Sequence, residues 1–326
     1  MAFLMTRFNK INFNFYPITK PLIFNMNGVD DVDGILSLWK PRGMTSHDCV
    51  MRCRKLFKTK KVGHTGTLDP EVDGVLPICI GNATKIVPFL TDTKKTYIAE
   101  VKLGIATDTE DAQGTVLEEM EVSESPSTES VRNVLLSFQG SITQVPPMYS
   151  AVKVNGKKLY EYARENKTVE RPKRKITIFD IELLDKKHDS FKIKVICSKG
   201  TYIRTLCVDI GKKLGYPAHM SDLTRIKTGS FSEKNSVDFA IIEEAVMKNE
   251  ESNLLFPIVK GLDHLDTLYV DETLENKVKN GQKLPIPEVL PKTNPFMVIH
   301  KNKLLAIYQI HPENKNQIKP IRVFNG

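Results

Sequence analysis

The sequence has few cysteines, and their spacing excludes two classes of protein. The five cysteines among 326 residues are an odd number, lie far apart and include no C-x-x-C pair. A disulfide framework or a zinc ribbon requires regularly spaced pairs, so both are excluded. The seven histidines never pair with cysteine at metal-ligand spacing, and we expect no metal. Reduced thiols in a cytosol-like compartment are the expectation.

Long hydrophobic runs are also lacking. No stretch reaches the roughly 18 uninterrupted apolar residues that a membrane-spanning helix requires. With 40% hydrophobic and 26% charged residues, the composition is typical of a globular protein, and we expect a cytoplasmic location. The length predicts two domains of unequal size. The net charge of +8 favours a polyanionic partner but does not identify one.

The first 29 residues contain no acidic side chain, although they carry Arg7, Lys10 and Lys20. Polar residues interrupt every apolar stretch, which excludes a secretory signal. Organelle targeting by this basic leader stays open as the minor alternative. We favour a start of translation at Met26, and treat 1–33 as an N-terminal extension.

Hydrophobic periodicity predicts the main elements. The pattern indicates a helix capped by Thr45 or Ser46. Residues 81–85 could present Lys85 to a phosphate, and a helix start capped by Asn82 explains them as well. A solvated stretch is expected over 118–129. The remaining expectations are strands over 34–39, 97–103, 176–184 and 191–196, and helices over 131–138 and 206–214, the last ending near Gly215. After Pro257, short apolar runs broken by Pro and Gly predict a small β-rich module.

Residues 62–77 are the segment with the highest density of chemically capable groups. They include His64 and Asp69, and Asp69 precedes a proline that keeps it out of a helix. An acid held on a rigid turn is a suitable nucleophile or base, but on this segment alone an Asx-turn, in which Asp69 bonds to its own backbone, is slightly favoured. A calcium loop is excluded because its twelfth position would be Ile80, and no phosphate-loop pattern occurs.

Residues 198–206 place Tyr202 and Arg204 two positions apart. On a strand, both would face the same side. A buried Arg204 could orient an acid such as Asp69 through charge-assisted hydrogen bonds, whereas a surface ion pair would contribute almost nothing. Tyr97 could stack on a base or belong to the core. Two basic stretches, 51–61 and 151–175, could follow an RNA backbone or be solvated faces.

Several of these segments together resemble a known family. The stretch GHTGTLDPEVDGVLPICIGNATK resembles the signature of the TruB-type tRNA pseudouridine synthases. The segments GILSLWKPRGMTSHD, KTYIAEVKLGIATDTEDAQG, VPPMYSAVKVNGKKLYEYARE, SKGTYIRTL and AHMSDLTRIKTGSF agree with it in order. The tail is similar to the PUA-like C-terminal module of bacterial members.

The resemblance implies an α+β fold and a reaction. The expected catalytic domain, 34–262, has a mixed, largely antiparallel sheet and a basic RNA-gripping insertion at about 141–178, and 263–326 is the PUA-like RNA-binding module. The implied activity is isomerisation of uridine 55 in the T-loop of tRNA to pseudouridine, after flipping of the base, without a cofactor. A monomer without a protein partner is expected.

The resemblance also implies roles for individual residues. Asp69 corresponds to the catalytic aspartate, and Tyr97 to a tyrosine that stacks on the flipped base. Arg204 corresponds to the arginine that pairs with the catalytic acid, Tyr202 lines the same pocket, and His64 occupies space vacated by the nucleotide. Other implied substrate-binding residues are Lys40, Pro41 and Leu223.

The sequence departs from the family pattern at a few positions. Trp39 stands where an acid is usual, Val72 and Asp73 replace smaller residues, and Thr224 replaces the first of an arginine pair. None of these removes a catalytic group, so they affect RNA contacts rather than the reaction. Two other functions stay open, namely a non-catalytic tRNA-binding protein and a glycosidase that releases the base.

Overall fold

The computed structural model describes residues 32–324, so the predicted extension lies almost entirely outside it, together with Met26. Ten strands form one large sheet and five form a separate sheet near the C-terminus. The α-helices are α1 (Ser46–Leu56), α2 (Val87–Thr91), α3 (Thr128–Leu136), α4 (Leu159–Arg164), α5 (Ile203–Leu214), α6 (Phe239–Met247) and α7 (Glu272–Lys279). Short 3-10 helices span Gly81–Ile86, Glu233–Asn235, Glu251–Leu254 and Ile258–Leu262.

The large sheet is mixed but mainly antiparallel. Its order is β14 (Leu255–Phe256), β1 (Gly34–Lys40), β3 (Asp73–Ile80), β12 (Ala218–Thr228), β4 (Lys95–Leu103), β11 (Ser190–Cys197), β10 (Arg174–Lys186) and β7 (Gly140–Gln144). In addition, β2 (Val62–His64) pairs with β3, and β13 (Phe231–Ser232) pairs with β12. Only β3 and β12 pair in parallel among these strands of the described chain. The predicted α+β fold is confirmed.

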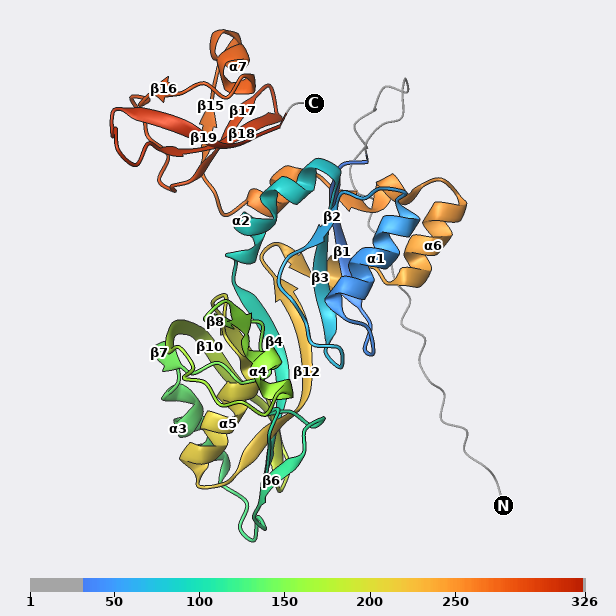
Figure 1. Cartoon of the computed structure of the whole chain (residues 1–326), viewed down its shortest axis with the longest axis vertical. Helices are drawn as coiled ribbons and strands as arrows, with labels where there is room; N and C mark the ends of the chain where they lie inside the picture. Colours follow the sequence, from blue (N-terminus) through green and yellow to red (C-terminus); the bar gives the residue numbers. More distant parts are fainter. Residues whose placement is uncertain (1–31, 325–326) are drawn as a thin grey trace. The chain divides into compact units, whose positions relative to one another are not determined.

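The long strands β4 and β12 run side by side at the centre of this sheet (Figure 1). Helix α5 packs on both strands, and α3 packs on α5 and β10. Helices α1 and α6 lie together near β1, where the Arg52 guanidinium sits 4.2 Å from the centre of the Phe239 ring and also binds Glu243. Buried aliphatic side chains of the strands and of α1 and α5 form the core. This frame fixes β4 and β12, which carry Tyr97 and Leu223.

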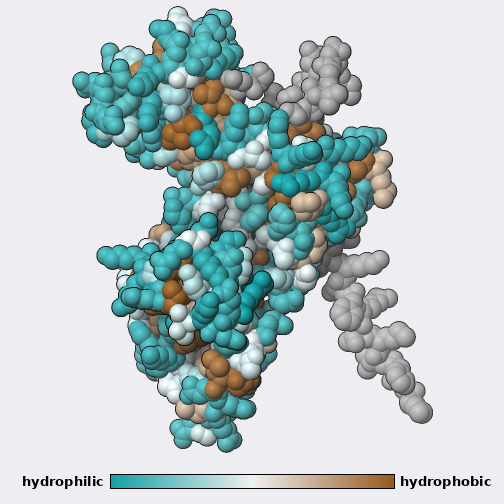
Figure 2. Space-filling model, in the orientation of Figure 1, coloured by the Kyte–Doolittle hydropathy of each residue, from teal (hydrophilic) through white to brown (hydrophobic). Residues whose placement is uncertain are grey.

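The C-terminal sheet contains β15 (Thr267–Tyr269), β17 (Phe296–His300), β18 (Lys303–Ile310), β19 (Gln317–Val323) and β16 (Leu284–Pro285), in that order. Its own core includes Phe296, Leu305 and the fully buried Tyr308. The prediction of a β-rich module after Pro257 is therefore confirmed. In Figure 2 the visible surface is mainly hydrophilic, and hydrophobic residues gather only in small groups.

Two helix ends follow local sequence rules. Thr45 caps α1 in a capping box with Asp48, because its hydroxyl accepts the Asp48 N–H while the Asp48 carboxylate accepts the Thr45 N–H. Gly215 ends α5 in a left-handed conformation, φ 86°, that favours glycine. Both ends agree with the predictions made from the sequence.

Two local predictions are wrong. Helix α5 begins at Ile203, so Tyr202 and Arg204 do not lie on a strand; Tyr202 precedes the helix and Arg204 lies in its first turn. Asn82 caps no helix, because a 3-10 helix begins at Gly81 and the Asn82 amide binds Asp33. The prediction of a solvated stretch over 118–129 is confirmed, because most of its residues are exposed; its first two residues belong to strand β6 (Val116–Glu119), which pairs with β5 (Ile105–Thr107).

Candidate active site

The loop that joins β2 to β3, residues 65–72, carries Asp69 and is called the Asp69 loop below. Several contacts fix its backbone. The Ser46 hydroxyl accepts the Leu68 N–H at 2.9 Å and lies 3.1 Å from the Leu68 carbonyl, to which it donates. The Pro70 carbonyl accepts both the Lys40 ammonium and the Gly43 N–H at 3.0 Å. These anchors hold the loop rigid although it has no regular secondary structure.

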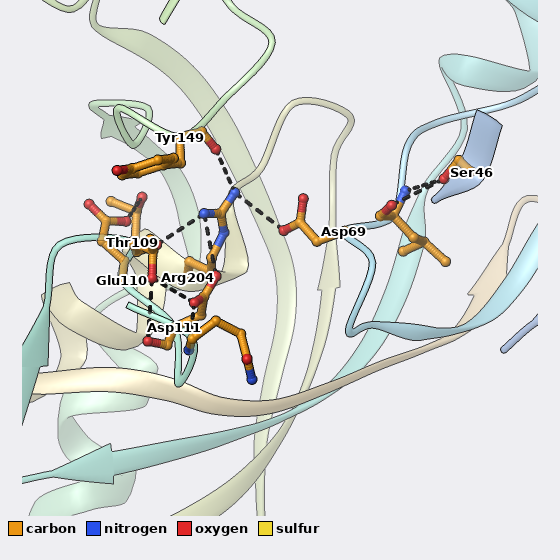
Figure 3. Close-up of polar contacts among 10 residues, drawn as sticks. Ser46, Asp69, Thr109, Glu110, Asp111, Tyr149 and Arg204 are labelled. Carbon is orange, nitrogen blue, oxygen red and sulfur yellow. Dashed lines mark hydrogen bonds and ion pairs between the residues drawn. The ribbon is translucent and has the colours of Figure 1, made fainter. Parts of the chain in front are cut away.

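The Asp69 carboxylate points toward α5 and is 45% exposed (Figure 3). Its Oδ2 lies 3.2 Å from Nη2 of Arg204. The backbone carbonyl of Asp69 accepts the Val72 N–H, so the turn is closed by main-chain atoms rather than by the carboxylate. The carboxylate is therefore oriented by Arg204 while one side stays open to a ligand.

Arg204 is only 7% exposed and lies between Asp69 and the turn that contains Asp111 (Figure 3). Its Nη1 donates to the Thr109 carbonyl at 3.0 Å and lies 3.6 Å from Asp111 Oδ2. Its Nη2 donates to the Tyr149 carbonyl at 2.9 Å. A guanidinium with this many fixed acceptors has one available orientation, and that orientation faces Asp69.

Glu110 belongs to the same turn and connects it to α5 through its carboxylate. Its φ of 64° is rare for a residue other than glycine, and its carboxylate accepts the Thr205 hydroxyl at 2.6 Å. Burial raises the pKa of Glu110, whereas the Thr205 hydrogen bond and the Arg204 charge oppose that rise. The turn is thereby tied to α5 next to Arg204.

Tyr97 lies on β4 directly opposite Arg225 of β12. Burial raises the pKa of Tyr97, while the charge of Arg225 and a hydrogen bond to it act in the opposite direction. Tyr97 packs at the edge of the main core, and Leu223, 7% exposed, belongs to that core. A flat aromatic ring beside a buried leucine offers an apolar surface for a base.

Tyr202 is fixed through its main chain. The Gln144 side chain accepts the Tyr202 N–H at 2.8 Å and donates to the Tyr202 carbonyl at 2.9 Å. His64 ends β2, and burial lowers its pKa, with the charge of Arg225 acting in the same direction. A neutral His64 at neutral pH follows from both effects.

Lys40 has no exposed surface, and its ammonium donates to the carbonyls of Pro41 and Pro70 at 2.8 and 3.0 Å. Burial lowers the pKa of Lys40, although the charges of Cys49, Asp73 and other acids oppose this. Lys40 thus binds the Asp69 loop at Pro70 and also holds the Pro41 carbonyl. The structure brings together Asp69 and Arg204 directly, and Lys40 through the loop backbone.

Four contributors were missed by sequence reasoning, namely Ser46, Asp111, Gln144 and Arg225. Ser46, Asp111 and Arg225 lie inside segments that resemble the family, but nothing in residue type alone distinguishes them. Gln144 lies at the end of β7, far along the chain from its partner Tyr202. Tertiary contacts alone reveal these four.

Within residues 32–324, no group of three or more His, Cys, Asp or Glu side chains is arranged to hold a metal ion. The same part of the chain contains no helix that is both long and apolar enough to cross a membrane.

Two family models match the chain. The model described as TruB family pseudouridylate synthase (N terminal domain) matches residues 54–203, and the model described as tRNA pseudouridylate synthase B C-terminal domain matches residues 204–265. A tRNA pseudouridine synthase B of Oceanobacillus iheyensis is 64% identical over 294 residues, which cover 89% of this chain and 97% of the relative. The chain belongs to the TruB family of pseudouridylate synthases.

Further comparisons agree with membership of the TruB family. The tRNA pseudouridine synthase B of Bacillus licheniformis is 51% identical over 300 residues, 89% of this chain and 97% of that protein. Among solved structures, one of a Cbf5-Nop10-Gar1 complex matches with a TM-score of 0.69 at 27% identity, over 90% of this chain and 84% of the other. The resemblance found in the sequence is confirmed, and the chain is an isomerase that forms pseudouridine.

Proposed function

We propose that this enzyme isomerises uridine 55 in the T-loop of tRNA to pseudouridine, and that Asp69 is the catalytic group. The Asp69–Arg204 ion pair carries the proposal, because it presents a half-exposed carboxylate that is already oriented by a buried guanidinium. The relatives named tRNA pseudouridine synthase B support tRNA as the substrate.

The reaction exchanges one bond to the ribose for another. The bond between the ribose C1′ and N1 of uracil breaks, the base turns, and a bond from C1′ to C5 forms. C5 then loses its proton, and N1 gains one, so the reaction consumes no co-reactant. The Asp69 carboxylate initiates the glycosidic cleavage, and Arg204, 3.2 Å away, holds it in position.

The other site residues bind the flipped nucleotide. Tyr97 stacks on the uracil, Leu223 and Tyr202 form the wall of the pocket, and His64 occupies the space that the nucleotide leaves. Lys40 and Pro41 complete the site under the Asp69 loop. Base flipping costs a few kcal/mol, which stacking on an aromatic ring at about 1 to 3 kcal/mol offsets in part.

We assign the binding of the RNA to two regions of the chain. The insertion at about 141–178 includes the hairpin of β8 (Lys153–Val154) and β9 (Lys157–Lys158) followed by α4, and the exposed Lys153, Lys173, Arg174 and Lys175 suit phosphate contacts. Residues 263–326 act as a PUA-like RNA-binding module beside the catalytic domain, 34–262. We assign the enzyme to the cytoplasm, as a monomer, which sedimentation of the purified protein tests.

The test is incubation of the purified full chain with unmodified tRNA, followed by mapping of pseudouridine along the RNA. The wild type is expected to modify position 55 only. Asp69→Asn should abolish the product while tRNA binding, measured by filter retention, persists. Asp73→Asn is the matched control, since Asp73 lies nearby but bonds to Thr224 and Arg42 rather than to Arg204.

Product analysis also separates the other functions. Release of free uracil with an abasic site would identify a glycosidase. Binding without any change of the RNA would identify a tRNA-binding protein. A second modified position would contradict the single-site proposal, and full activity of Asp69→Asn would contradict the catalytic assignment.

A further inference from the structure

Arg225 is a buried cation that makes no contact expected of an RNA-binding residue. Only 1% of it is exposed, and it is among the largest fully buried side chains of residues 32–324. Its Nε donates to the Val75 carbonyl at 2.8 Å, and its Nη2 donates to the Gly66 carbonyl at 3.1 Å. A charge this deep in the protein is costly unless its donors are satisfied, so its position is precisely determined.

Those two carbonyls flank the Asp69 loop. Gly66 lies at its beginning, and Val75 lies on β3 just after its end. One planar guanidinium therefore holds the two ends of the loop together, whereas Ser46 and Lys40 anchor its middle. A guanidinium can do this because its donors diverge in a fixed plane, which an ammonium group lacks.

The same residue is paired with the second candidate group of the site. Arg225 lies directly opposite Tyr97 in the β12–β4 ladder, and its charge lowers the pKa of the Tyr97 phenol. On its other side, Arg225 pairs with Gly74 of β3, where a Cβ would overlap the Arg225 carbonyl oxygen. Gly74, with φ 120°, thus permits the close approach of β3 and β12 on which this arrangement depends.

We propose that Arg225 is a positioning residue, whose guanidinium joins the Asp69 loop to the strand that carries Tyr97 and thereby fixes the two groups relative to each other. The role rests on the proposed function of Asp69 and Tyr97. It differs from that of Arg204, which contacts the Asp69 carboxylate itself. Arg225 contacts the loop only through backbone carbonyls and acts on Asp69 through the loop.

Other charged groups near Tyr97 must be considered in any test. The groups that influence its titration are Arg225 from β12, Cys197 from β11 and Asp69 from the loop. Cys197 and Asp69 raise the pKa of Tyr97, as burial does, and Arg225 alone among these three lowers it. Removal of the Arg225 charge should therefore raise the pKa of the Tyr97 phenol, whereas a looser loop, with Asp69 farther away, should lower it.

The variants are Arg225→Lys, which retains the charge but not the divergent donors, and Arg225→Met, which loses both. Ser46→Ala is the matched control, because it removes a different anchor of the same loop without contact to Tyr97. The single-turnover rate should fall about 100-fold in Arg225→Lys, the scale that a misplacement near 1 Å produces, whereas the dissociation constant for tRNA changes little. Circular dichroism verifies that each variant is folded.

A second measurement is independent of activity. The 13Cζ resonance of Tyr97, assigned with Tyr97→Phe, is recorded in the RNA-free protein. It should shift in Arg225→Met, which loses the charge, but not in Ser46→Ala. An unchanged resonance in folded Arg225→Met would overturn the proposal, as would a wild-type single-turnover rate in Arg225→Lys. A shifted resonance in an enzyme that makes no pseudouridine would instead contradict the proposed function alone.

Discussion

The two residues of the Asp69–Arg204 ion pair should contribute very unequally to the stability of the fold. Asp69 is 45% exposed, and its carboxylate has one ion-pair partner in the described chain, whereas Arg204 is 7% exposed and has three further acceptors. An exposed partner of an ion pair contributes about 0.2 to 1 kcal/mol. Asp69→Asn should therefore lower the free energy of unfolding by at most about 1 kcal/mol.

Removal of Arg204 should lower the free energy of unfolding much more than removal of the Asp69 charge does. Its hydrogen bonds to the Thr109 and Tyr149 carbonyls come from a charged donor and contribute about 1.5 to 3 kcal/mol each. Asp111, 18% exposed, also loses the cation that lies 3.6 Å away. Because some acceptors regain water, we expect Arg204→Met to lower the free energy of unfolding by about 3 to 5 kcal/mol.

Urea unfolding followed by circular dichroism measures both variants, and the fluorescence of the single tryptophan, Trp39 on β1, reports on the large sheet. Both variants should lose pseudouridine formation, so activity alone does not distinguish them. Equal losses of stability in the two variants would refute the reasoning. A loss below about 1 kcal/mol for Arg204→Met would show that its carbonyl contacts are weak.

The remaining predictions concern other parts of the chain. Burial lowers the pKa of Lys95 to about 8 from 10.5, so the folded state binds fewer protons than the unfolded state between these values, and stability should rise with pH across that window by up to about 3 kcal/mol. Lys95→Met should remove this rise in urea titrations at pH 8 to 10.5. Thr45→Ala breaks the capping box of α1 and should cost about 1 kcal/mol in thermal unfolding. Lys173→Ala should weaken tRNA binding and reduce the salt slope of log K by about 0.7 to 0.9, whereas Lys248→Ala, in an ion pair with Glu244 on α6, should leave the slope unchanged.

The strands were predictable because their patterns are local. Residues 97–103 and 191–196 alternate clearly, and β4 and β11 contain them with extensions of a few residues. The beginning of α5 was not predictable, because Tyr202 has no side-chain cap and its N–H is instead accepted by Gln144 of β7. A cap supplied by a distant strand leaves no signal beside the helix.

The site shows the same division between local and tertiary information. Asp69 stands out in the sequence because its glycine-rich surroundings are unusual, and Arg204 because of its proximity to Tyr202. Arg225 does not stand out, since a basic residue in an alternating segment usually faces solvent. Its burial follows only from the position of β12 between β3 and β4. The departures Asp73 and Thr224 illustrate the point further, because they hydrogen-bond to each other at 2.7 Å across β3 and β12.

The choice of acceptors for the buried cations has an electrostatic consequence. Lys40 and Arg225 donate mainly to backbone carbonyls, and Arg204 divides its donors between carbonyls and carboxylates. A backbone carbonyl accepts a hydrogen bond from a cation but leaves its positive charge in place. A carboxylate accepts the hydrogen bond and also neutralises the charge. The positive charge beside the Asp69 loop therefore persists, and it favours an incoming phosphate. The net charge of +8 does not reveal this local positive charge. The local charge depends on which acceptors the fold supplies to three particular cations, and not on how many cations the chain contains.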